Sequence, residues 1–207
     1  MSELVIERVG GAAIESYLSA LARLRIEVFR AYPYLYEGSR AYEESYLRGY
    51  AQDPRAVVVV ARRAGEVAAR QGFAGVIGAA TAMPLVAHGE GLAPVLERAG
   101  YAPDSIYYFG ESVLLASERR QGIGHRFFDE REAAAREHGF RLAAFCAVER
   151  PPGHPACPPD YVPYDAFWSK RGYVRHPEIN TKFAWRDVGE SASSDKTMVF
   201  WLKELAP

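Results

Sequence analysis

A short basic, glycine-rich segment is the part of this sequence best suited to bind an anion. It reads Arg119-Arg120-Gln121-Gly122-Ile123-Gly124 and lies between an apolar, aromatic stretch and a segment with helical periodicity. The first N–H groups of a helix have no intrahelical acceptor, and the positive end of the helix dipole lies beside them. Because the two glycines have no side chains, a phosphate group can approach these N–H groups, and the arginines add positive charge. The segment therefore predicts a phosphate site between a strand and a helix.

The spacing of the glycines separates this segment from other phosphate loops. The pattern Gly-x-x-x-x-Gly-Lys-Ser/Thr occurs nowhere in the chain, and the dinucleotide fingerprint would need a third glycine where Phe127 stands. What remains is Arg-x-x-Gly-x-Gly, formed by Arg119, Gly122 and Gly124. This pattern resembles the acyl-coenzyme A loop of the GNAT N-acetyltransferase superfamily. A tight turn that uses glycine only for packing is the alternative for the motif by itself.

A second segment strengthens the resemblance. Residues 164–173 read Tyr-Asp-Ala-Phe-Trp-Ser-Lys-Arg-Gly-Tyr, which is similar to the family's Phe-Tyr-x-x-x-Gly-Phe segment, whose helix covers coenzyme A. The resemblance implies that Phe167 and Trp168 lie along the cofactor. The family's frequent general-acid tyrosine, four residues before the glycine, is Trp168 here, and indole cannot supply a proton at neutral pH. We expect Tyr164, one helical turn earlier on the same face, to replace it, although a packed ring with an exposed hydroxyl is the alternative.

The resemblance implies both a fold and a reaction. The fold is a single α/β domain over residues 1–207, with a mixed, mostly antiparallel sheet flanked by helices. The reaction is transfer of an acetyl group from acetyl-CoA to a primary amine of a small molecule or peptide, by direct attack. The resemblance also implies that a backbone N–H of Val113, Leu114 or Leu115, in the strand before the loop, would polarise the thioester. The coenzyme A contacts that this resemblance implies are Val113, Leu114, Leu115, Arg119, Arg120, Gln121, Gly122, Ile123, Gly124 and His125.

Glu111 is the residue that we expect to accept the amine proton. It alternates with Phe109 and Val113 in the strand that leads to the phosphate loop. A carboxylate at this place could take a proton from the amine directly or through water. A carboxylate in an apolar strand is costly to bury without a partner or a purpose. An ion pair, or solvation at the strand end, is the alternative explanation.

An aromatic region near the N-terminus is the candidate acceptor site. Tyr32, Tyr34 and Tyr36 lie in a loop over residues 31–38, where hydroxyl-bearing rings at the surface could form a wall for the acceptor. The tyrosines at 42, 46 and 50 follow at helical spacing, which favours the core face of a helix. The adjacent carboxylates, Glu43 and Glu44, could attract a cationic acceptor.

Composition favours one globular domain. The chain has 207 residues, is 49% apolar and carries a net charge of -1, so it can bury a sizeable core, and it has no basic excess that would indicate nucleic acid. No signal-peptide pattern and no apolar run of about 18 residues occur, so we expect a cytoplasmic protein that does not cross a membrane. Cys146 and Cys157 are expected to be reduced thiols. His154 and Cys157 are too few for a metal site, and no metal is expected.

The pattern of elements predicts a mixed α/β layer around one sheet. Two strands near residues 56–61 and 75–83 are expected to form a hairpin whose turn contains Gly65, and residues 84–105 to form an excursion with a short helix. The strand over residues 198–202 is either internal or an edge that pairs with a second copy in a homodimer. The other expected strands cover residues 4–9, the stretch that begins at 107, residues 141–148 and residues 180–186. One helix is expected to begin near Gly11, a second at Gly122, and a third covers residues 164–171.

Two other functions stay open. The first is a regulatory domain that binds coenzyme A but has lost catalysis, because Trp168 stands where the family has its general acid. Such a domain would bind coenzyme A as the enzyme does and would differ from it only in lacking turnover. A nucleotide-binding protein depends on Gly-x-Gly alone, and stabilisation by ATP or NAD but not by acetyl-CoA would support it.

Overall fold

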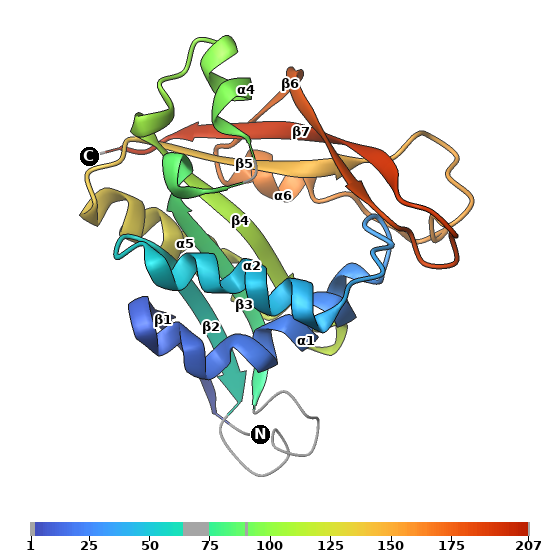
Figure 1. The fold of residues 1–207 in the computed structure, drawn as a ribbon, viewed down its shortest axis with the longest axis horizontal. Coiled ribbons are helices and arrows are strands. Elements are labelled where there is room, and N and C mark those ends of the chain that lie inside the picture. The colour runs from blue at the N-terminus through green and yellow to red at the C-terminus, as the bar shows by residue number, and fades with distance from the viewer. Residues whose placement is uncertain (1–2, 64–74, 90, 207) are drawn as a thin grey trace.

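The protein forms one seven-stranded sheet with the strand order β1-β2-β3-β4-β5-β7-β6 (Figure 1). The computed structural model describes residues 3–63, 75–89 and 91–206. Neighbouring strands are antiparallel, except for the parallel pair β4 and β5. The strands are β1 (Leu4–Val9), β2 (Val57–Arg63), β3 (Val76–Pro84), β4 (Ile106–Leu114), β5 (Leu142–Glu149), β6 (Val174–Trp185) and β7 (Ser194–Glu204).

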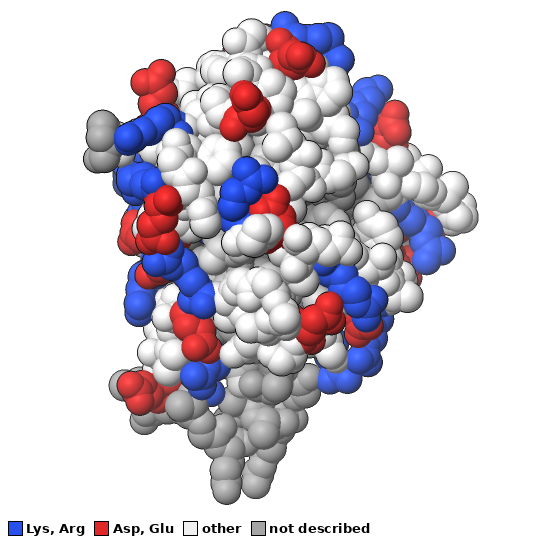
Figure 2. Space-filling model, turned by 60° about the vertical axis from the view of Figure 1, so that its left-hand side comes forward, with Lys and Arg blue, Asp and Glu red and all other residues white. Residues whose placement is uncertain are grey.

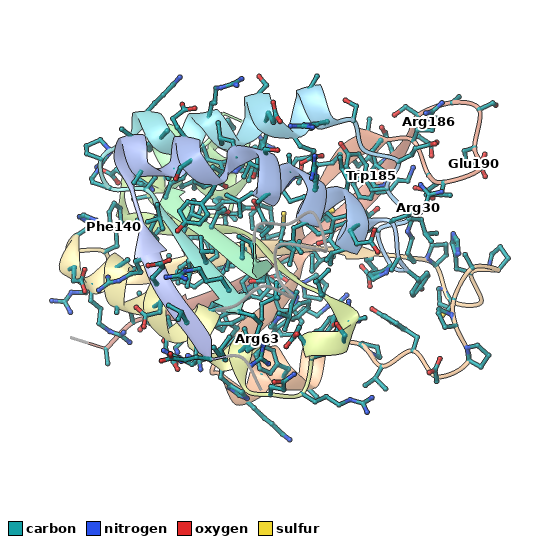
Figure 3. The ribbon with its side chains drawn as sticks, turned by 90° about the horizontal axis from the view of Figure 1, so that it is seen from below. Arg30, Arg63, Phe140, Trp185, Arg186 and Glu190 are labelled. Atoms are coloured by element: carbon teal, nitrogen blue, oxygen red, sulfur yellow. The ribbon has the colours of Figure 1, made fainter. Side chains whose placement is uncertain are left out.

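Helices cover both faces of the sheet. Helices α1 and α2 lie on one face, and α5 lies on the opposite face, as the view from below shows (Figure 3). The α-helices are α1 (Leu18–Phe29), α2 (Arg40–Gln52), α4 (Ala93–Arg98), α5 (Ile123–Glu137) and α6 (Asp165–Lys170). Short 3-10 helices are η1 (Gly11–Tyr17), η2 (Leu85–Ala87), η3 (Pro103–Ser105) and η4 (Ala116–Glu118).

Strand β2 explains how one sheet supports two cores. Its side chains alternate between the faces, as in any strand. Val57 and Val59 pack in the core that contains Phe127 of α5, whereas Val58 and Val60 pack in the core on the α1 side. Both faces are buried, so this strand is a continuous apolar run and does not alternate with polar residues.

The sheet splits between β4 and β5. These strands pair only over Ile106–Tyr108 and Leu142–Ala144. Beyond Tyr108, β4 continues beside β3 and β5 continues beside β7, so the two halves of the sheet diverge. Gly110 lies where the split begins; a Cβ atom there would lie 2.6 Å from Thr81 Oγ1 and even closer to the hydroxyl of Tyr50. Only glycine fits at this point, next to a register shift in the pairing of β3 with β4.

Most of the expected elements are confirmed, one open alternative is decided, and one boundary is corrected. Strands β2 and β3 pair antiparallel, although the turn with Gly65 lies outside the described residues. The C-terminal strand β7 is internal, between β5 and β6, so it is not an edge that a second copy could pair with. Strand β6 begins at Val174, six residues before the expected start at 180, and its pairing with β7 shifts between His176 and Asn180. This irregularity removes the alternation that would have identified the first half of the strand.

Charges of both signs are interspersed on the surface. Figure 2 shows basic and acidic side chains next to one another over the visible face, without a large area of one sign. Within the described residues, no helix combines the length and the apolar character that a membrane crossing requires.

Candidate active site

Two cavities meet at Glu111. The split cavity, of about 510 Å³, lies between the diverging strands β4 and β5 and extends to α6. The aromatic cavity, of about 450 Å³, lies between α1, α2 and β6. Each cavity has its own walls, but five residues line both: Phe29, Tyr34, Gly110, Glu111 and Cys146. A group in one cavity can therefore reach a group in the other beside Glu111.

Glu111 is buried and has partners on both carboxylate oxygens. Its side chain is 5% exposed; Oε1 lies 2.7 Å from Arg25 Nη1 as an ion pair, and Oε2 accepts a hydrogen bond of 3.1 Å from the Tyr46 hydroxyl. Its backbone N–H donates to Thr81 Oγ1 at 3.2 Å. Glu111 thus has the ion pair that was the alternative explanation, and it also lines both cavities. The ion pair compensates the buried charge, and the cavities leave the carboxylate within reach of a ligand.

Arg25 connects Glu111 to a second buried carboxylate. It forms a short ion pair with Glu43, whose side chain is completely buried, and its guanidinium stacks 4.5 Å from the centroid of the Tyr46 ring. Burial opposes the charged form of Arg25, but the negative charges of Glu111 and Glu43 outweigh it, so the pKa of Arg25 lies well above its usual value. Glu43 faces Arg25 and does not line the aromatic cavity, so it does not touch a ligand there and acts on one only through its charge. Glu44 pairs with Arg40 at 2.7 Å.

The walls of the aromatic cavity come from segments far apart in the sequence. Tyr34 stacks with Trp185 at 6.1 Å between ring centroids, and Trp185 Nε1 donates to the Tyr34 carbonyl at 3.0 Å. Arg150 fixes the same loop, because its Nη2 donates to the Tyr34 carbonyl at 2.6 Å and it forms an ion pair with Asp187 at 2.7 Å. Figure 3 shows Trp185 of β6 at the same end of the molecule as Arg30, which follows α1.

The three loop tyrosines do not share one cavity. Tyr36 lines the aromatic cavity, Tyr34 lines both cavities, and Tyr32 lines only the split cavity. The Tyr32 ring packs edge-to-face on Tyr161 at 4.7 Å. The structure therefore separates Tyr32 from the candidate acceptor wall, while Tyr34 and Tyr36 remain there.

His88 lies behind Tyr46 at the edge of the aromatic cavity. Its Nε2 is 3.4 Å from the Tyr46 hydroxyl, which lies 3.0 Å from that of Tyr50. The imidazole is 7% exposed, and burial, followed by the positive charge of Arg25, lowers the pKa of His88 to about 4. His88 is thus neutral at pH 7. These three side chains extend the polar network of Glu111, with Tyr46 and His88 on the wall of the aromatic cavity.

The turn before α5 fits a phosphate group. Arg120 and Gly122 both adopt left-handed backbone conformations, with φ of 65° and 79°, and a Cβ atom on Gly122 would meet no other atom within 4 Å. The side chains of Arg119, Arg120 and Gln121 are exposed around the first turn of the helix, next to N–H groups that have no intrahelical acceptor. An anion can therefore approach the backbone here, as the sequence led us to expect for coenzyme A pyrophosphate.

Gly124 and His125 lie against α6. A Cβ atom on Gly124 would be 3.7 Å from Phe167 Cζ, and the ring of Phe167 packs 4.8 Å from that of His125. Ile123 is buried in the core. These contacts bring α6 over the start of α5, between the phosphate turn and the split cavity.

Strand β4 presents backbone N–H groups to the split. The N–H of Leu115 donates to the Ile77 carbonyl at 3.0 Å, so it is engaged by β3. Hydrogen-bonding directions alternate along a strand, so Val113 also faces β3, whereas Leu114 and Ser112 face the open side. Of the three backbone N–H groups expected to polarise a thioester, only that of Leu114 points toward the split. The N–H of Ser112 is a second group with this direction, which the sequence had not indicated.

Tyr164 and Trp168 lie on one side of α6 and both line the split cavity. Trp168 packs 5.1 Å from both Phe145 and Trp201, whereas Tyr164 is 45% exposed at the start of the helix, 5.9 Å from Trp168. Trp168 thus has a packing role in the wall. The Tyr164 hydroxyl lines the split cavity and could supply a proton to a group bound there.

Solved structures share this fold. A ribosomal-protein-alanine N-acetyltransferase from Brucella melitensis aligns with 97% of this chain and 99% of its own at 16% identity, with a TM-score of 0.59. A GCN5-related (GNAT) N-acetyltransferase from Kribbella flavida covers 98% of both chains at 15% identity and a TM-score of 0.58. A proposed acetyltransferase from Salmonella typhimurium, solved with acetyl-CoA, covers 100% of this chain and 96% of its own at 10% identity and a TM-score of 0.57.

These likenesses establish the fold that the sequence motifs had suggested: a single domain with the GNAT architecture. In sequence, the chain matches no protein-family model and no curated protein. The described residues contain no group of three or more potential metal-binding side chains. What the site does must therefore be argued from its own geometry.

Proposed function

We propose that this protein is an N-acetyltransferase that transfers the acetyl group of acetyl-CoA to a primary amine by direct attack. The observation that carries the proposal is the meeting of the split cavity and the aromatic cavity at Glu111. One cavity is lined by Phe128 and Arg131 of α5, the helix that begins at the phosphate turn, and the other has aromatic walls. This arrangement suits a long acyl donor and a separate acceptor.

In the donor site, one group of residues binds the pyrophosphate and another binds the thioester and the pantetheine arm. The exposed arginines Arg119 and Arg120 and the N–H groups at the start of α5 hold the pyrophosphate. The N–H of Leu114 donates to the thioester oxygen as it gains negative charge. Phe167 and Trp168 on α6 form the cover over the pantetheine arm.

Glu111 acts as the general base. It accepts a proton from the amine directly or through water, while the amine nitrogen bonds to the carbonyl carbon. The carbon–sulfur bond then breaks, and sulfur leaves with the electron pair as a thiolate. Tyr164 supplies a proton to that thiolate. Each step thus has a residue of suitable chemistry on the wall of the cavity concerned.

The acceptor is a cationic amine with a ring or another apolar portion. Tyr34, Tyr36 and Trp185 offer apolar faces, and the buried pair of carboxylates on one arginine leaves a net negative charge at the inner end. An ammonium group is attracted there before it loses its proton.

The test is a panel of aromatic, aliphatic and peptide amines with acetyl-CoA, scored by mass spectrometry of the acetylated product and by release of coenzyme A. We expect acetylation of at least one ring-bearing amine and thiol release that depends on the amine. Tight binding of acetyl-CoA with no amine-dependent release over the whole panel would favour the silent regulatory domain. Failure to bind acetyl-CoA at all would contradict both.

A further inference from the structure

Arg131 of α5 is a buried cation inside the wall of the split cavity. The residue is 2% exposed, and its guanidinium lies 4.4 Å and 4.7 Å from the ring centroids of Phe109 and Phe128. It donates from Nη1 to the Glu111 carbonyl at 3.3 Å and from Nη2 to Ser112 Oγ at 2.8 Å. It therefore touches the stretch of β4 that faces the split.

The partners of Arg131 are neutral. Nε donates to the Phe127 carbonyl at 3.1 Å, and Nη1 also donates to the Thr81 carbonyl at 3.4 Å. No carboxylate of the described residues forms an ion pair with it, in contrast to Arg25, which has two. A buried charge without an ion-pair partner is costly, and an apolar side chain would fill the same space at lower cost. The residue thus keeps a positive charge available to the cavity.

The charge persists at neutral pH. Burial lowers the pKa of Arg131 to about 10, so the guanidinium is still protonated. The charged and titratable groups that act on it from the surrounding elements are Glu111 on β4, Glu132 on α5, Tyr50 on α2 and Tyr173 before β6. Of these, Glu132 is already engaged by Lys203 at 2.9 Å.

We propose that Arg131 stabilises the negative charge that develops on the sulfur of coenzyme A as the carbon–sulfur bond breaks. The inference rests on the proposed function, because it assumes that the thioester occupies the split cavity. The electron pair of the broken bond stays on sulfur, and the buried guanidinium lowers the energy of that thiolate before a proton arrives. This role complements Tyr164, and it explains how Trp168 can stand where a proton donor would be expected.

The test is a pH titration of the thiol in the complex of the protein with free coenzyme A, followed by thiolate absorbance. The complex with desulfo-coenzyme A, which lacks the sulfur, is subtracted to remove the signal of Cys146 and Cys157. In the wild type we expect the bound thiol to titrate about one pH unit or more below free coenzyme A, a tenfold change in thiolate. Arg131→Met should abolish that difference, and Arg131→Lys should keep part of it.

Arg171→Met is the matched control. Arg171 also stacks on the Phe128 ring, at 5.3 Å, but it pairs with Asp129 at 2.7 Å and does not line the split cavity. This variant should titrate as the wild type does. An unshifted thiol in the wild-type complex would overturn the inference even if Arg131→Met does not fold. The inference would also be overturned if the thiol titrates in Arg131→Met as it does in the wild type while the variant still binds desulfo-coenzyme A. Failure to bind coenzyme A at all would instead count against the proposed function.

Discussion

The guanidinium of Arg25 on α1 lies 2.7 Å from the carboxylate of Glu111 on β4, where the two cavities meet. Arg25 also pairs with Glu43 on α2, so two buried carboxylates share one arginine and the three groups sum to a charge of about -1. His88, neutral at pH 7, does not compensate it, and the cation Arg131, which donates to the Glu111 carbonyl, lines the split cavity and not the aromatic one. The inner end of the aromatic cavity is therefore suited to an ammonium group, which supports an amine acceptor.

The phosphate turn can be tested with Gly122→Asp. The aspartate would place a side chain and a negative charge against the N–H groups that we propose bind the pyrophosphate, so we expect acetyl-CoA affinity to fall at least about a hundredfold in calorimetry. Gly139→Asp is the matched control. Gly139 follows the same helix, has φ of 80° and has equally open space around its Cβ position. Equal affinity for the two variants would refute the assignment of the turn.

The two aromatic residues of α6 should respond differently to substitution. Trp168→Phe should keep most of the turnover and lose some stability, because the ring packs on Phe145 and Trp201. Tyr164→Phe should lower turnover about tenfold, less than usual for loss of an acid, because Arg131 shares the stabilisation of the thiolate. Steady-state kinetics with saturating acetyl-CoA measures both. If Trp168→Phe loses more than about a hundredfold in turnover while acetyl-CoA binding stays intact, the assignment of proton transfer to Tyr164 and not to Trp168 is wrong.

His88 should make stability depend on pH. Its pKa is about 4 in the folded protein, below the ordinary value of 6.5, so the unfolded chain binds the proton more strongly. The stabilisation is complete above pH 6.5 and is lost as the pH falls toward 4, by about 3 kcal/mol in total. Denaturant unfolding of the wild type and His88→Gln over this range measures it. A pH dependence that is identical in the two proteins would show that His88 does not cause it.

The sequence was informative where local patterns decide structure. The valine run in β2 and the helical period after Gly122 predicted elements that the structure confirms. Arg25 was missed, although a signal existed. It continues the buried stripe of Leu18 and Leu21 on the first helix, and a charged residue on such a stripe indicates a buried partner.

Other features depend on contacts that no local pattern carries. The ion pair of Arg25 and Glu111 joins two elements that lie before and after the β2–β3 hairpin in the sequence. The split between β4 and β5 depends on how all seven strands pair. The helical spacing assigned Tyr46 to a core face, and its ring does pack against the core, but the spacing gave no sign that its hydroxyl bonds to Glu111. Arg131 lies on the apolar side of α5, where periodicity alone does not distinguish a packed stem from a charge aimed at a cavity.

The most direct measurement of the central claim is the pH–rate profile of Glu111→Gln beside that of Glu43→Gln. Both variants remove one carboxylate from Arg25, but only Glu111 lines the cavities. We expect Glu111→Gln to lower turnover at neutral pH by about a hundredfold, with acetyl-CoA affinity nearly unchanged and the loss shrinking as the amine becomes neutral at higher pH. Glu43→Gln should lose stability but keep turnover within a few-fold. A wild-type rate for Glu111→Gln across the whole profile would contradict the account.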